Sequence, residues 1–200
     1  MIMRRQFLLT VVLMPITFGL WYAAGPLFAA PAVWLCDFAL GHLYPLAIHK
    51  AQLQEANMAA ITQFGQVQES IVSAGEAGHQ IVLEVNSRLV SYSIAFYAAL
   101  ISASNLKDAI HKFVVGLFIL WILMAFGLAS VVGKDLMLLA GPQFLEQPWV
   151  PHADIVALSY QFNVLLMPTL APVAVWIWQL RGSPLWESLA ADIKRASGQA

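Results

Sequence analysis

The sequence predicts a mainly α-helical integral membrane protein with about four transmembrane helices, an interfacial helix and a small outer β-like segment. Of its 200 residues, 60% are hydrophobic and only 10% are charged, whereas about a quarter of the residues in a soluble domain are charged. The mean hydropathy is +0.72. Because a transmembrane helix needs about 20 mostly apolar residues, the chain has room for about four such helices and one modest extramembrane piece.

Residues 1–48 are predicted to hold a first transmembrane helix and then an interfacial helix. The run from Phe7 to Ala24 is apolar and is longer than the apolar region of a signal peptide, which spans about 7–15 residues. Gly25-Pro26 indicates where this helix ends, because proline removes a helix hydrogen bond. The stretch 27–48 stays apolar but carries amphipathic aromatic residues. We therefore expect it to lie in the membrane interface, with a further span as the alternative.

Residues 49–88 are predicted to form an extracytoplasmic β-like segment. Gln, Glu, Ser, Gly and Asn replace the long apolar runs here, and the side chains of residues 81–86 alternate with the period of a strand. Residues 60–64 and 66–72 are candidate partner strands, and a turn at 75–78 follows them. A segment this short buries too little surface to be an independent domain. We expect it to rest on the membrane part or on a partner.

Residues 89–180 are predicted to form a three-helix transmembrane region, and residues 181–200 a polar cytoplasmic tail. The three apolar runs are Leu89–Leu106, Phe113–Val132 and Ile155–Leu180. A polar connector at 105–112 and a loop at 133–154 separate them. Each run approaches the length that a bilayer requires.

The positive charges predict how the protein is oriented. With four spans, the amino terminus, the connector 105–112 and the tail lie on one side of the membrane. That side holds seven of the ten Lys and Arg residues, namely Arg4, Arg5, Lys107, Lys112, Arg181, Lys194 and Arg195. The positive-inside rule therefore places both termini in the cytoplasm and the segment 49–88 outside.

A group of polar side chains beside the second apolar run is the candidate binding site. Asn86 ends the strand-like stretch, and Tyr92 lies one helical turn beyond Arg88. Arg88 offers a fixed fork of donors to a carboxylate at a partly desolvated boundary. We interpret this group as a partner-binding lip, which Tyr160 and Gln161 near the outer end of the last span can meet. The alternative is an arginine that extends to lipid headgroups while its neighbours cap the helix.

Cys36, the only cysteine, is a weak candidate for catalysis. A thiolate nucleophile needs a nearby base, a cation or a helix amino terminus. The residues that would supply one are His42, His49, His79, His152 and Arg88. With such a partner the chain would be a cysteine-dependent membrane peptidase or transpeptidase. The alternative is a cysteine that packs as a small hydrophobe, and the sequence favours this non-enzymatic interpretation.

Motifs of cofactor, metal and nucleic-acid sites are absent from the sequence. It contains no GxxxxGK[ST], GxGxxG, HExxH, GxSxG or paired CxxC pattern. His42 and His49 are two helical turns apart, too far to share one metal ion directly. The net charge is −1 and the basic residues are scattered. We expect no cofactor, no metal and no nucleic acid, and membrane lipid as the immediate surroundings.

Two blocks of sequence resemble one known family. The first block comprises LEVN at 83–86, LVSYS at 89–93 and AAL at 98–100. The second comprises YQF at 160–162 and LLMPTLAPV at 165–173, with Trp176. Together with an early span, an outer β-like segment and three further spans, they resemble the exosortase H-associated membrane proteins of Gram-negative bacteria.

The resemblance implies an accessory protein of an exosortase H system in the bacterial inner membrane. Exosortase H is an enzyme thought to process proteins with a C-terminal sorting signal of the PEP-CTERM type, so the implied partner is a polytopic exosortase or its substrates. Exosortases resemble this chain in being polytopic, and they use a cysteine and an arginine near the outer face. Their motifs do not fall on Cys36 or Arg88, which favours a helper over the peptidase itself.

Overall fold

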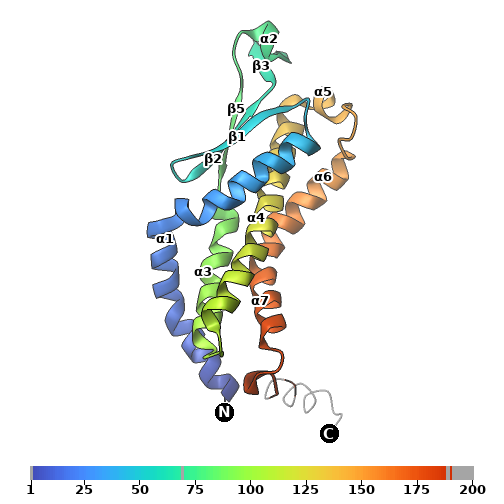
Figure 1. Ribbon diagram of the computed structural model, residues 1–200. Coiled ribbons are helices and arrows are strands. Elements are labelled where there is room, and N and C mark those ends of the chain that lie inside the picture. Colours follow the sequence, from blue (N-terminus) through green and yellow to red (C-terminus); the bar gives the residue numbers. More distant parts are fainter. Residues whose placement is uncertain (1, 69, 188–189, 191–200) are drawn as a thin grey trace. The chain divides into compact units, whose positions relative to one another are not determined.

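The computed structural model describes residues 2–68, 70–187 and 190, which are mainly helical with two small antiparallel sheets (Figure 1). The chain divides into two compact units. The first comprises Met1–Ala23, Tyr92–Leu120 and Thr169–Ala200, and the second comprises Ala24–Ser91 and Trp121–Pro168. The first unit therefore combines stretches from the beginning, the middle and the end of the chain, and the second combines the two stretches between them.

Three helical stretches in the described part of the chain are long and apolar enough to cross a membrane. They are Arg4–Leu43, Ala109–Ala140 and Ala153–Leu180. Helix α3 (Arg88–Ala103) is apolar but has only 16 residues, fewer than the roughly 20 that a span requires. The structure thus has three candidate spans among its described residues, and the prediction of a fourth depends on α3.

Helix α1 (Ile2–Leu43) bends where the sequence predicts an end. Ala24 has φ −107° and ψ 16°, so two helical segments meet there. Pro26 lacks an N–H, and its ring clashes with the preceding turn, which is an ordinary cause of a kink. The helix resumes at once, so the predicted end at Gly25-Pro26 is a kink. The predicted interfacial helix 27–48 corresponds to the second segment of α1 and ends at Leu43.

The segment 49–88 forms β-structure, as predicted. A three-stranded antiparallel sheet has the order β1-β2-β5. Its strands are β1 (Ile48–Gln54), β2 (Asn57–Thr62) and β5 (Val82–Asn86). A separate hairpin pairs β3 (Phe64–Val67) with β4 (Ser70–Ser73). The short helix α2 (Ala74–Ala77) stands in the predicted turn.

The alternating stretch 81–86 is confirmed as β5, but its partner strands differ from those predicted. The predicted strand 60–64 covers the end of β2 and the start of β3. The predicted strand 66–72 reverses direction between β3 and β4, where Gln68 has φ 55°. β1 was not predicted as a strand, because its polar sequence lacks a clean alternation.

Helix α4 (Ala109–Ala140) contains the predicted run Phe113–Val132 and continues beyond it. The prediction of a loop from residue 133 is wrong as far as Ala140. Lys134 and Asp135, which made this stretch look polar, form an ion pair of 2.6 Å and are both partly buried. Neighbouring opposite charges lower the cost of placing both in an apolar helix.

The last predicted run is a continuous helical stretch with a wider segment inside it. After the short helix α5 (Pro142–Leu145), the stretch consists of α6 (Ala153–Tyr160), the π-helix η1 (Gln161–Leu166) and α7 (Met167–Leu180). The backbone N–H of Met167 donates to the carbonyl of Phe162, five residues earlier. The wider turn lies just before Pro168, which has no N–H to give to a regular helix. Most of the predicted tail lies outside the described residues.

Candidate docking surface

A single residue, Ser87, separates β5 from α3. Its carbonyl accepts a hydrogen bond from the N–H of Ser91 at 3.1 Å, and its hydroxyl donates to the carbonyl of Ala56 on the turn before β2 at 2.5 Å. Asn86 Oδ1 accepts from the backbone N–H of Arg88 at 3.0 Å. The bond to Asn86 satisfies an N–H that the start of a helix leaves unpaired. The predicted change from strand to helix is confirmed, and Asn86 has a local role in it.

Arg88, the first residue of α3, lies against the kink of α1. A β-carbon built on Gly25 would stand 4.0 Å from Arg88 Nε, and the kink is at Ala24. The Arg88 side chain is partly buried. Because residue 25 is a glycine, the guanidinium group has room beside the α1 backbone. The second unit therefore holds this cation in a defined place, between the start of α3 and the bend of α1.

Tyr92 lies one turn beyond Arg88, as predicted, but it belongs to the first unit. Its hydroxyl is 3.1 Å from Thr169 Oγ1 on α7. Tyr92 therefore joins α3 to α7 inside the first unit. The candidate docking surface therefore consists of residues of the second unit only, and Tyr92 is not part of it.

Tyr160 and its neighbours on η1 contact α4. Lys134 Nζ stands 4.9 Å from the centre of the Tyr160 ring, which is cation–π distance. Asn163 Nδ2 donates to Ser130 Oγ at 3.1 Å. Gln161 is exposed at the first position of the π-helix, and wider turns of this kind are frequent at functional sites.

The start of α3 and the π-helix approach the same point of α4. A β-carbon on Gly127 would lie 2.8 Å from Val90 Cγ1 and 3.4 Å from the carbonyl oxygen of Asn163. A small residue lets helix backbones approach closely. Because Gly127 has no side chain, the beginning of α3 and η1 can pack closely on α4 within the second unit.

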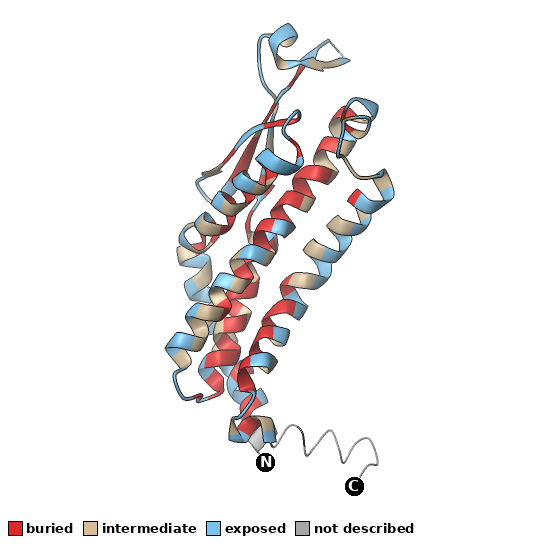
Figure 2. Cartoon of the chain, turned by 45° about the vertical axis from the view of Figure 1, so that its right-hand side comes forward, coloured by how far each residue is buried: buried red, intermediate tan, exposed pale blue. Residues whose placement is uncertain are grey.

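The segment from β4 to β5 is the most exposed part of the second unit. From Ser70 to Glu84 every residue is exposed or partly exposed, as Figure 2 shows for the hairpin and its neighbours. Among the described strands, β5 pairs only with β2. The opposite strand β1 is engaged by α1, because Asp37 Oδ1 accepts from the Ala51 N–H at 2.6 Å. The outer edge of β5 thus offers backbone donors and acceptors, the feature by which sheets pair with another chain.

This exposed segment is nevertheless tightly built. A β-carbon on Gly65 would collide with the Cβ of Ala77, so β3 and α2 touch through a residue without a side chain. Gly78 ends α2 with φ 74°, a conformation that glycine adopts without strain. Gln143 Nε2 of α5 donates to the Ile71 carbonyl of β4 at 2.7 Å. The segment is therefore an exposed surface with a defined shape.

Cys36 is completely buried in α1. Across residues 2–68, 70–187 and 190, Cys36 has no hydrogen bond or ion pair that would activate its thiol. His42 Nδ1 is 2.8 Å from the carbonyl of Phe38, and His152 caps α6. This environment is that of a packing cysteine. In the same ranges no three His, Cys, Asp or Glu side chains are placed to hold a metal ion.

Long apolar helices together with two small antiparallel sheets define a mainly helical membrane protein with a β-segment. The family model of the exosortase H-associated membrane proteins matches residues 2–183, which is most of the chain. The chain therefore belongs to this family, as the two sequence blocks predict. Neither the curated proteins nor the solved structures gave a match.

Proposed function

We propose that this protein is an accessory subunit of an exosortase H protein-sorting system in the bacterial inner membrane. The observation that carries the proposal is the family match over residues 2–183. In this role the protein binds the exosortase, or its substrates with a C-terminal signal, and catalyses no reaction itself. The buried thiol of Cys36 is consistent with a non-catalytic subunit.

The proposed docking surface lies in the second unit. It consists of the exposed segment from Ser70 to Glu84, the outer edge of β5, and the polar junction at Asn86 and Arg88. An extended chain can add itself to the edge of β5 through backbone hydrogen bonds. Arg88 can then donate two parallel hydrogen bonds to one carboxylate, because its guanidinium group is planar and its N–H donors point the same way. Gln161 is the exposed residue that η1 adds to the same unit.

The proposed topology has four spans and cytoplasmic termini. The first helical part is 1–48, the extracytoplasmic segment 49–88, the three-helix region 89–180 and the cytoplasmic tail 181–200. Helix α3, with its 16 residues, is about 24 Å long, against about 30 Å for the hydrocarbon core. Arg88 and Lys107 flank α3, and long basic side chains reach the headgroups from a short span.

The test is co-purification with the exosortase H encoded in the same genome. The two proteins are co-expressed, and one is captured in a mild detergent. The proposal expects the partner to be recovered with the unmodified chain. Arg88→Gln should reduce the recovery about tenfold, because pairing of a partly buried arginine with a carboxylate is worth about 1.5–3 kcal/mol.

Two control variants accompany this test. Lys50→Gln removes one exposed positive charge from β1 in the same unit and should leave recovery unchanged. Cys36→Ser should also leave it unchanged. If the unmodified pair does not co-purify, the accessory role is wrong. If the pair co-purifies equally well with Arg88→Gln, the docking surface lies elsewhere.

A further inference from the structure

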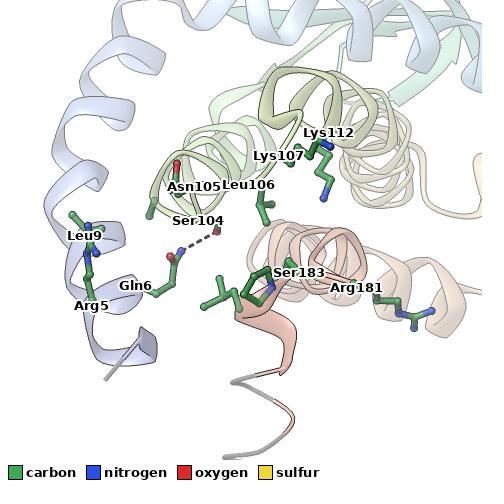
Figure 3. A pocket seen from close by; sticks show the side chains of 14 residues that line it. Arg5, Gln6, Leu9, Ser104, Asn105, Leu106, Lys107, Lys112, Arg181 and Ser183 are labelled. Carbon is green, nitrogen blue, oxygen red and sulfur yellow. Dashed lines mark hydrogen bonds between the residues drawn. The ribbon is translucent and has the colours of Figure 1, made fainter.

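The first unit contains a cavity of about 470 Å³ whose wall carries four cationic side chains. These are Arg5, Lys107, Lys112 and Arg181. They come from three separate stretches of the chain: the start of α1, the region from the α3–α4 connector into α4, and the turn after α7. Figure 3 shows these stretches around the cavity, with Gln6 reaching toward Ser104 in its wall. The fold therefore assembles positive charge that is dispersed in the sequence.

No carboxylate among the described residues lines this cavity to neutralise the four cations. Asp108 follows Lys107, and Glu187 lies just beyond the lining residue Leu185, but neither belongs to the wall. The remaining polar lining is neutral and consists of Gln6, Ser104, Asn105 and Ser183. Several cations around one concave site favour an anion, and phosphate oxygens match such a set of donors.

Buried hydrogen bonds fix the floor of the cavity. Gln6 Nε2 donates to Ser104 Oγ at 2.9 Å, and Trp176 Nε1 donates to the same oxygen at 2.7 Å. Ser104 therefore ties α1 and α7 to the end of α3. Lys112 is also held, because its Nζ donates to the Gln179 carbonyl at 2.9 Å. Such a wall has little conformational freedom to lose when a ligand binds.

A shallow, open strip on one face of α1 adjoins this cavity. It consists of Arg4, Arg5, Leu8, Leu9 and Val12. Arg5 and Leu9 belong to both the strip and the cavity lining, so the two adjoin. Leu8 is 53% exposed and Val12 is 65% exposed, which leaves an uncovered apolar strip. A free phosphate ion gains no free energy from contact with this apolar strip, whereas an acyl chain gains it by covering the strip.

We propose that the first unit binds one anionic phospholipid. Its phosphate group occupies the basic cavity, and one of its acyl chains lies along the exposed strip of α1 at Leu8 and Val12. Basic pockets between membrane helices bind anionic headgroups by the same electrostatics. The apolar strip that begins at Arg5 favours an intact lipid over free phosphate, because only the lipid gains from covering apolar surface.

The test measures lipid binding to the full-length protein in a neutral detergent. The probes are dioleoylphosphatidylglycerol, dioleoylphosphatidylcholine with the same chains, and inorganic phosphate. Native mass spectrometry counts the bound lipid, and the thermal midpoint reports stabilisation. We expect the phosphatidylglycerol probe to bind at least about tenfold more tightly than the phosphatidylcholine probe. Inorganic phosphate alone should not raise the midpoint.

The variant for this test is Arg5→Gln/Lys107→Gln/Arg181→Gln. All three side chains are exposed, so the protein should still fold, and we expect the preference for the anionic lipid to fall at least about tenfold. Lys107→Gln alone, in a surface connector, should weaken binding about fivefold and serves if the triple variant expresses poorly. Lys50→Gln, which removes a charge in the second unit, should change nothing.

Three results would overturn the proposal. One is equal binding of the two lipids by the unmodified protein. Another is an unchanged preference in Lys107→Gln and in the triple variant. The third is a thermal shift with inorganic phosphate as large as that with lipid, which would assign the cavity to a soluble anion. Co-purification with exosortase H does not enter this measurement, so the two proposals can fail independently.

Discussion

The two units hold their helices together in different ways. In the first unit, buried polar side chains join the helices. The Tyr97 hydroxyl lies 2.6 Å from Gln179 Oε1 and 2.9 Å from the Lys112 carbonyl, and Gln179 Nε2 donates to that carbonyl at 2.8 Å. In the second unit, close approaches at Gly127 and at Gly133, where Tyr44 fills the space above the backbone, accompany the Asn163–Ser130 hydrogen bond, which is only partly buried.

These two kinds of helix contact suit the two units to different roles. Apolar helices gain little hydrophobic energy from meeting each other in lipid, so they associate by close packing and hydrogen bonds. The first unit uses hydrogen bonds whose donors and acceptors are enclosed, and these bonds fix its geometry. The second unit keeps much of its polar surface exposed, from Ser70 to Glu84. This exposed surface is where the partner is proposed to bind.

Filling the space above Gly116 should have the largest effect on stability. A β-carbon at this position would collide with the hydroxyl of Tyr97, and Tyr97 is held by the contacts just described. Gly116→Ala should destabilise the protein by about 2–3 kcal/mol, the upper part of the range for overpacking. Unfolding in a mixed-micelle denaturant series measures it.

A double variant sharpens this prediction. Tyr97→Leu removes the three colliding atoms, namely the hydroxyl oxygen, Cζ and Cε1, so adding Gly116→Ala to it should cost less than Gly116→Ala costs alone. Gly19→Ala is the matched control, because among the described residues no atom beyond its own turn of helix lies within 4 Å of the added carbon. An equal loss in Gly19→Ala and Gly116→Ala would mean that the contact with Tyr97 is not the cause.

Removing Gln179 should have the next largest effect. Gln179→Leu deletes both side-chain contacts of the amide and leaves the Tyr97 hydroxyl with the Lys112 carbonyl alone. We expect a loss of about 1–2 kcal/mol, since hydrogen bonds between membrane helices are worth about 0.6–1.7 kcal/mol each. The same denaturant series measures it. Gln161→Leu, which alters an exposed glutamine of the second unit, should cost nothing measurable, and a comparable loss there would contradict the comparison.

The smallest effect is expected at Gly127 of the second unit. The nearest atom to an added β-carbon is the Cγ1 of Val90 at 2.8 Å, a single side-chain methyl group rather than a backbone atom. Alanine also favours a helix over glycine by about 1 kcal/mol, which offsets the crowding. Gly127→Ala should therefore change the unfolding free energy by less than about 1 kcal/mol. A loss as large as that of Gly116→Ala would show that the two units tolerate an added methyl group at a helix contact equally poorly.

Periodicity and apolar run length predicted the parts of this fold that depend on one stretch of chain. The alternation at 81–86 and the apolar run after it correctly gave β5 and α3, and the two sequence blocks correctly gave the family. The kink at Ala24 was misread as an end, because a proline signals a break without saying whether the helix resumes. β1 was missed, because its pairing with β2 outweighs its weak local pattern.

The polar contacts of the first unit were not predicted, because they join residues far apart in the sequence. Tyr97 and Gln179 stand in apolar runs, where a polar side chain signals an internal contact. That signal also marks Tyr160 and Gln161, but it does not say which side chain any of these residues contacts. The basic cavity likewise brings Arg5 together with Lys107 and Arg181, and only the packing of the helices shows that these charges share a wall.

Site-specific photo-crosslinking tests the central claim most directly. A photoreactive amino acid replaces Glu84, which is exposed on the edge strand β5, or Ile110, which is 83% exposed in the first unit. Cells that also produce the exosortase H of the same genome are irradiated, and the cross-linked products are identified by mass. The account predicts a covalent product with exosortase H from position 84 and none from position 110. A product from position 110 alone, or none from either position, would contradict it.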